Sequence, residues 1–259
     1  MPPTGDEYTH VMSYNILTSN QNKQAVIDLI LAQDPDVFGV QEASTAWATY
    51  LPQLLEEYEM IGFGRDSTGV NCENATATNN KGEGCYIFYR KSMFTVAEAK
   101  TYWLSETPTT KSQFSCETDS YYRIFTYAKL IRKSDSKPMV FCNTHLELDA
   151  AARALEVEMI LKYMAPYVAQ NIPVIITGDF NMYTTETAAF GQFAPAGFQS
   201  AGIAATNKGN TAPTFSTTNP SAIIDYIMCS DDMEITYYAV ILDASNTSDH
   251  RPIYAWVKY

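Results

Sequence analysis

The stretch Ile172-Pro173-Val174-Ile175-Ile176-Thr177-Gly178-Asp179-Phe180-Asn181 decides the fold of this chain. An apolar run of strand character ends directly in glycine, aspartate and asparagine. Short polar clusters that follow buried strands are how α/β scaffolds present catalytic groups. The chain repeats the pattern at Asn15, Gln41-Glu42, Thr144-His145, Asp225 and Asp249-His250. If these strands lie side by side, their polar ends converge on one cleft.

The hydrophobic pattern around these clusters predicts many strands and three helices. Strands are expected over 10–16, 36–40, 86–89, 95–104, 122–132, 139–144, 174–177, 223–228, 235–242 and 253–257. Helices are expected over 22–32, 46–58 and 150–170. This content favours two sheets packed together and flanked by helices. The length of 259 residues suits one large domain or two small ones.

The net charge of -12 restricts the class of partner. Affinity for phosphate backbones comes largely from Lys and Arg, so the charge argues against a tight nonspecific grip on a polyanion. A bound cation would offset part of the negative field. No transmembrane run is present. A composition rich in Thr, Ser, Asn and Tyr with few Lys favours an exported protein.

The five cysteines form no CxxC metal pattern. Cys72 and Cys85 flank a polar insertion and are candidates to pair with each other. Cys142 and Cys229 stand in apolar runs and are predicted to be buried small side chains. The triplet Asn74-Ala75-Thr76 matches a glycosylation sequon, although such triplets are common by chance.

Together the clusters resemble the endonuclease/exonuclease/phosphatase superfamily of DNase I-like, Mg-dependent phosphoesterases. The matching pieces keep the family's order over essentially the whole chain. They are Ser13-Tyr14-Asn15-Ile16, Val40-Gln41-Glu42, Asn143-Thr144-His145-Leu146-Glu147, Gly178-Asp179-Phe180-Asn181, Ile224-Asp225-Tyr226-Ile227 and Ser248-Asp249-His250. Two further stretches, Ile87 to Arg90 and Trp103 to Pro108, are similar to a bacterial branch of small members, as are Arg123 and Arg153.

This resemblance implies a fold of the α/β (α+β) class. The fold is a four-layer DNase I-like sandwich, with two mixed β-sheets packed face to face and helices outside. It further implies a single domain over residues 1–259 and a monomer.

The resemblance also implies a Mg²⁺ site, with Mn²⁺ as the alternative ion. Glu42 is expected to be the principal ligand, because a hard divalent ion prefers carboxylate oxygens. Asn15 is expected to offer a neutral oxygen, and Asp249 either to ligate a metal or to hold His250. Whether one metal or two are bound stays open.

The implied proton chemistry involves His250, Asp225 and Asp179. Imidazole titrates near neutral pH, so His250 is the candidate general base or transition-state donor. Asp225 would orient the imidazole by accepting a hydrogen bond. Asp179 would orient or deprotonate the attacking water. Which of Asp179 and His250 takes the proton stays open.

The remaining implied roles concern the phosphate. Asn181 and His145 would donate hydrogen bonds to phosphoryl oxygens, where charge grows in the transition state. Arg123 would pair with a substrate phosphate or form a structural ion pair. His10 lies outside the motifs and has no assigned role.

The predicted reaction is hydrolysis of a phosphodiester or phosphomonoester by in-line attack of a metal-oriented water. The substrate is a nucleic acid, which would make the protein a nuclease, or a small phosphorylated molecule. Alternatives are a deadenylase-type ribonuclease, a lipid or inositol phosphate phosphatase, and a catalytically silent binding module. The sparse Lys and Arg disfavour the ribonuclease, and the complete catalytic set disfavours the silent module. The loops 64–84 and 105–121 are predicted to set substrate choice.

Overall fold

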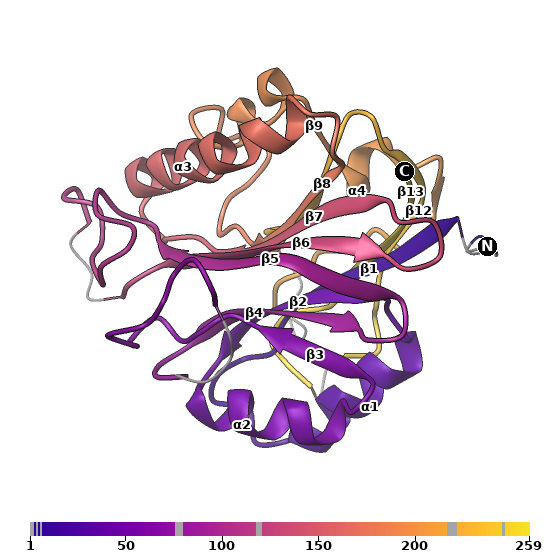
Figure 1. Ribbon diagram of the computed structural model, residues 1–259, viewed down its shortest axis with the longest axis horizontal. Coiled ribbons are helices and arrows are strands. Elements are labelled where there is room, and N and C mark those ends of the chain that lie inside the picture. Colours follow the sequence, from indigo (N-terminus) through magenta and orange to yellow (C-terminus); the bar gives the residue numbers. More distant parts are fainter. Residues whose placement is uncertain are drawn as a thin grey trace.

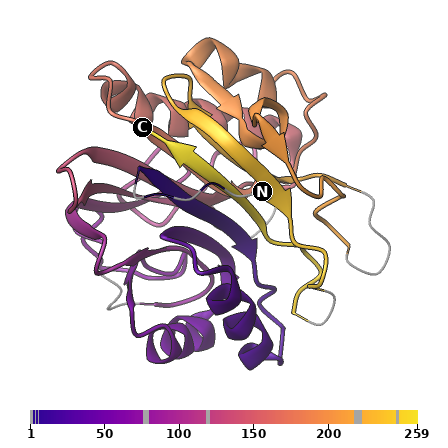
Figure 2. The same ribbon diagram turned by 90° about the vertical axis from the view of Figure 1, so that its right-hand side faces the viewer.

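The computed structural model describes residues 3, 5, 7–75, 80–117, 121–216, 222–244 and 247–259. One mixed sheet has the order β10-β12-β13-β1-β2-β4-β3. Its strands are β1 (Tyr8–Asn15), β2 (Val37–Ala43), β3 (Tyr58–Ile61), β4 (Gly84–Arg90), β10 (Asn207–Lys208), β12 (Glu234–Val240) and β13 (Ile253–Lys258). β1 and β13 pair antiparallel, so segments from the two ends of the described chain lie side by side (Figure 2).

The other mixed sheet has the order β5-β6-β7-β8-β11-β9. Its strands are β5 (Phe94–Trp103), β6 (Ile124–Arg132), β7 (Pro138–His145), β8 (Val174–Asp179), β9 (Phe198–Ser200) and β11 (Asp225–Ser230). The described helices are α1 (Lys23–Gln33), α2 (Thr45–Leu54), α3 (Ala150–Val168) and α4 (Ala201–Ala204), with 3-10 turns at Phe190–Gln192 and Ala194–Ala196.

The sheets stack face to face between two helical layers (Figure 1). α1 and α2 cover the outer face of the first sheet, and α3 covers the outer face of the second. This is the four-layer α/β sandwich that the sequence resemblance implies. Among the described helices, none is both long and apolar enough to cross a membrane.

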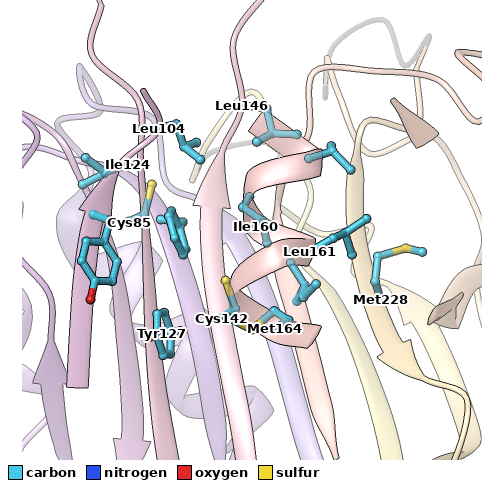
Figure 3. Close-up of a cluster of buried hydrophobic side chains, with 14 of the residues drawn as sticks. Cys85, Leu104, Ile124, Tyr127, Cys142, Leu146, Ile160, Leu161, Met164 and Met228 are labelled. Atoms are coloured by element: carbon cyan, nitrogen blue, oxygen red, sulfur yellow. The ribbon is translucent and has the colours of Figure 1, made fainter. Parts of the chain in front are cut away.

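Three buried apolar clusters hold the layers together. One lies between the sheets and includes Val11, Phe141 and Ile175. Another packs α1 and α2 against the first sheet. The third packs Ile160, Met164 and their neighbours on α3 against the second sheet (Figure 3). Apolar burial of this kind stabilises each layer against the next.

A buried polar network joins the sheets next to the site described below, and Asn143 is its centre. Its Nδ2 donates to the carbonyl oxygens of Val40 at 2.9 Å and Tyr86 at 3.0 Å. Its Oδ1 accepts from Gln41 Nε2 at 2.6 Å and from Thr177 Oγ1 at 3.2 Å. Every polar atom of the Asn143 amide is therefore paired, as the dry interior requires.

The structure corrects several element boundaries. The helix expected over 46–58 ends at Leu54, and Tyr58 instead begins β3, which pairs with β4 from Arg90 to Ile87. β2 continues through Gln41 and Glu42 to Ala43. β9, β10, α4 and the 3-10 turns were not expected from the sequence, because elements of two to four residues carry too little periodicity to detect.

All five cysteines lie within the described residues, and all carry free thiols. The pairing considered for Cys72 and Cys85 is therefore absent, although both side chains are buried. The predicted burial of Cys142 and Cys229 is confirmed. In the predicted sequon, Thr76 lies outside the described residues.

Candidate active site

The sheet topology brings the polar clusters to one end of the sandwich. β1 runs parallel to β2, and β7 runs parallel to β8, so the carboxyl ends of each pair lie together. β11 is antiparallel to β8 and begins opposite its last residue, and β13 is antiparallel to β1. The residues delivered there are Asn15, Glu42, His145, Asp179, Asp225 and His250. The convergence expected from the sequence is confirmed by their contacts.

Asp179 is the meeting point of these side chains. Its Oδ2 lies 3.0 Å from Asn15 Nδ2, 3.5 Å from His145 Nε2 and 3.4 Å from His250 Nε2. The carboxylate is buried, and its Oδ1 accepts from the Asn181 N–H at 3.0 Å. Burial raises the pKa of Asp179 to about 7, and the negative charge of Asp225 adds to the rise against the opposing effect of His250.

Glu42 lies beside this centre with an unusual backbone conformation. Its φ of 57° falls in the left-handed region, which a residue with a side chain adopts at a cost and often at a functional position. Its Oε1 accepts from Asn15 Nδ2 at 2.9 Å and its Oε2 from the Thr18 N–H at 3.0 Å. Glu42, His145 and Asp179 each offer a ligand atom, and these atoms all lie within 4.8 Å of one another.

Asn15 and Asp249 are placed differently from Glu42, the third predicted metal ligand. The amide nitrogen of Asn15 faces both carboxylates, and its Oδ1 accepts from the Leu17 N–H at 3.1 Å. In this orientation Asn15 bridges Glu42 and Asp179 as a donor. A second group of described residues that could hold a metal ion consists of Asp179, Asp225 and His250. Asp249 belongs to neither group, and its Oδ1 lies 3.4 Å from the Ser248 hydroxyl. Metal ligation by these two residues stays a prediction.

His250 and Asp225 form a buried pair. Nδ1 of His250 lies 2.9 Å from Oδ2 of Asp225 and 3.1 Å from its Oδ1. Burial by itself lowers the pKa of His250, but attraction to Asp225 and then to Asp179 outweighs it and raises that pKa to about 10. The ring of Phe215 packs against the imidazole at 4.9 Å between centroids. The imidazole is therefore held from two sides with Nε2 toward Asp179.

His145 and Asn181 also contact Asp179, the first through Nε2 at 3.5 Å and the second through its backbone N–H. Burial, and then the charge of Arg123, holds the pKa of His145 well below its usual range, so this imidazole is neutral. Asn181 Nδ2 donates to the Leu146 carbonyl at 2.9 Å and lies 3.1 Å from His145 Nε2. Asn181 also has a positive φ of 49°. Gly178 allows this turn to approach β7, because a Cβ there would lie 2.2 Å from the Thr144 carbonyl oxygen.

Arg123 forms a buried ion pair in which its Nε lies 3.0 Å from Glu147 Oε2. This is the structural alternative that the sequence left open. Arg123 nevertheless also lines a narrow pocket beside Glu42 and His145. Arg153 donates to the Glu147 carbonyl at 3.0 Å and to Glu186 at 2.6 Å, so it braces the segment that carries His145.

Arg65 is a residue of this pocket that sequence reasoning missed. Its Nη1 lies 3.1 Å from Glu83 Oε2, and its guanidinium stacks over Tyr121 at 5.0 Å. The signal in the sequence was only its place in the loop 64–84. That loop contacts the loop 105–121 through Lys111 Nζ and Asp66 Oδ1 at 2.7 Å. Residues 76–79 and 118–120 of the two predicted loops lie outside the described residues.

Known structures have the same architecture. An endonuclease/exonuclease/phosphatase family protein from Bacteroides thetaiotaomicron has a TM-score of 0.85 at 24% identity, covering 96% of this chain and 94% of its own. A mannosyl-6-phosphatase from Bacteroides thetaiotaomicron VPI-5482 has a TM-score of 0.84 at 23% identity, covering 97% and 100%. The human Nocturnin catalytic domain with bound sulfate has a TM-score of 0.75 at 20% identity, covering 97% and 94%.

At these sequence identities, structural similarity shows only that this chain shares the fold of those proteins. Comparison with curated proteins finds no match. The sequence profile described as Endonuclease/Exonuclease/phosphatase family matches residues 12–250, a span that contains all six motifs that carry the resemblance. The chain therefore belongs to the Endonuclease/Exonuclease/phosphatase family, whose members are phosphoester hydrolases.

Proposed function

We propose that this protein hydrolyses a phosphate ester with a bound divalent cation, Mg²⁺ or Mn²⁺. The observation that carries the proposal is the position of Asp179 Oδ2, which lies within 3.5 Å of Asn15, His145 and His250. Side chains from the ends of β1, β7 and β8 and from the segment before β13 would thus supply a cation site, a proton acceptor and a proton donor at one place.

The donor set fits a hard divalent cation. Glu42 and Asp179 contribute carboxylates, and the neutral imidazole of His145 lies with them in one group. Asp179 is a buried carboxylate whose raised pKa reflects unfavourable desolvation, and a cation would relieve that penalty. When bound, the cation would polarise the phosphoryl oxygen and lower the pKa of a bound water.

The contacts of His250 guide the assignment of the proton. Attraction to Asp225 and then to Asp179 raises the pKa of His250 against the effect of burial, which favours the imidazolium form beside Asp179. We therefore assign His250 as the donor to the reacting phosphate, oriented by Asp225. Asp179 is the group that receives the proton of the attacking water.

The charge near the narrow pocket favours a small substrate. Arg65 and Arg123 line it, but each is paired with a glutamate, Glu83 and Glu147. Little net positive charge remains for a long polyanion, in keeping with the net charge of -12. A small phosphorylated molecule is thus favoured over a nucleic acid. The mannosyl-6-phosphatase of the same fold supports the phosphomonoester reading.

The test compares Glu42→Ala and His250→Ala with the control Glu234→Ala, which changes an exposed glutamate at the start of β12. Release of product from p-nitrophenyl phosphate and bis(p-nitrophenyl) phosphate is measured with Mg²⁺, Mn²⁺ or chelator. We expect at least about a hundredfold loss in both site variants and none in the control. Unchanged turnover in either site variant would refute the proposal.

A second readout does not depend on turnover. A ligand that binds only the native state raises the free energy of unfolding, by about 2.7 kcal/mol at a hundred times its Kd. Mg²⁺ should therefore raise the Tm of the wild type and of His250→Ala, but not that of Glu42→Ala. An equal rise in Glu42→Ala would show that the cation binds elsewhere.

A further inference from the structure

A cavity of about 430 Å³ lies beside the catalytic pair and plays no part in the chemistry described above. Asp225, whose carboxylate holds His250, forms part of its wall. Tyr183 and Thr184 follow Asn181 by two and three residues, and Ile223 precedes Asp225 by two. The cavity therefore begins at the strand ends that carry the site, within the size range of pockets for small organic ligands.

The rim of this cavity exposes large apolar side chains. Tyr183 is 53% exposed, Ile203 64% and Ile223 41%. Exposed apolar side chains that gather around one hollow mark a binding surface, whereas single ones scattered over a surface do not. Gly202 forms part of the wall, and a Cβ added there would lie 3.4 Å from the ring of Tyr238.

The charge and hydrogen-bonding groups of the wall indicate the chemistry of its ligand. Among the described lining residues there is no Lys, Arg or His, so the wall offers no cation to hold an anionic group. Amide and guanidinium groups, which read the edges of nucleobases, are also absent from the described lining. The polar groups are instead hydroxyls, such as those of Thr184 and Thr211, which both donate and accept.

We infer that this cavity binds the uncharged organic part of the substrate, a sugar or sugar-like ring esterified to the phosphate. The inference rests on the proposed function, since the phosphate itself would lie at Asp179 and His250. Apolar C–H faces of the ring would contact Tyr183, Ile203 and Ile223, and its hydroxyls would meet the threonines. The phosphate and the neutral ring would thus occupy neighbouring places at the same group of strand ends.

The main test uses the ratio of kcat/KM for glucose 6-phosphate to that for methyl phosphate, with release of inorganic phosphate as the readout. Gly202→Leu places a large side chain in the cavity. Ile203→Ala removes a side chain that lines the cavity but is exposed and so contributes little to the core. Leu155→Ala is the matched control, because Leu155 is also exposed but lies on α3 beside another cavity.

We expect the ratio to fall about tenfold in Gly202→Leu and Ile203→Ala, because the loss of a few apolar pocket contacts has an effect of this size. The ratio should stay constant in Leu155→Ala. A ratio taken within each variant cancels a general loss of activity. An unchanged ratio in Gly202→Leu would overturn the inference. A higher kcat/KM for adenosine 5′-monophosphate than for glucose 6-phosphate would overturn the assignment to sugars.

A binding measurement separates this inference from the proposed function. The neutral probe methyl α-glucoside should raise the Tm of the wild type more than that of Gly202→Leu, even if neither ester is hydrolysed. Nonspecific stabilisation by the sugar should raise the Tm of both proteins equally, so the difference between the two Tm shifts measures binding in the cavity. Equal shifts in both proteins would count against the cavity while leaving the hydrolase proposal intact.

Discussion

Nδ1 of His250 lies 2.9 Å from Oδ2 of Asp225, and both side chains are almost fully buried, at 3% and 2% exposed. Removed from water, the two groups interact much more strongly than the same pair would at the surface. The charge of Asp225 therefore raises the pKa of His250, whose Nε2 lies 3.4 Å from Asp179 Oδ2. This relationship is the basis of the first prediction.

Asp225→Asn should lower kcat by about a hundredfold or more while leaving KM within a few-fold. The amide has nearly the same shape, but it lacks the charge that orients the imidazolium and stabilises it. Steady-state kinetics on a chromogenic phosphate ester would measure both constants. A variant with normal kcat would show that Asp225 supports the fold and has no part in the reaction.

Arg65→Ala should raise KM for a phosphate ester about tenfold, because it removes a guanidinium from the pocket that Glu42 and His145 share. Arg65→Lys keeps the charge and should recover part of the loss. Glu83→Gln releases Arg65 from its ion pair and should lower KM. If Glu83→Gln and Arg65→Ala raise KM equally, the pair has a structural role alone.

Asn143→Ala should lower the free energy of unfolding by about 3 kcal/mol. It leaves the carbonyls of Val40 and Tyr86 and the amide of Gln41 without their partner inside the sandwich. Urea denaturation measures the change. The control is Asn207→Ala, an exposed asparagine bonded to one carbonyl, for which we expect about 0.5 kcal/mol. Equal losses would mean that the inter-sheet network contributes little.

His10, which lies outside the catalytic cluster, should make the stability of the fold depend on pH. Burial lowers the pKa of His10 to about 4 from 6.5, and its ring stacks on Trp256 at 4.5 Å. Below pH 6.5 the imidazole of His10 binds a proton in the unfolded chain but not in the folded chain. The free energy of unfolding therefore decreases as the pH falls toward 4. The full decrease in the free energy of unfolding is about 3 kcal/mol.

The measurement is the difference in unfolding free energy between the wild type and His10→Phe at several pH values. Phenylalanine keeps an aromatic ring beside Trp256 but cannot titrate. The difference should be constant above pH 6.5 and should shift in favour of the variant as the pH falls to 4. A difference that does not vary with pH would contradict the neutral state of His10.

Much of the architecture could be predicted because its signals are local. The apolar run before Asp179 and the polar residues after it are adjacent in the chain, and the same holds for Asn15 and His145. The end of the helix expected over 46–58 was wrong for the opposite reason. Tyr58 to Ile61 form a strand because they pair with β4, which lies about thirty residues away, and such pairing overrides local propensity.

The sequence by itself determined which chemical groups the site contains and the order in which the strands deliver them. The tertiary structure alone decided that Asn15 and Asp179, 164 residues apart, share a hydrogen bond, and that Asn15 turns its amide nitrogen toward the carboxylates. It also decided the place of Arg65 and the cavity beside Asp225. The physical reason is that pKa values, ion pairs and cavities depend on distance and burial, and both are set by how the two sheets stack.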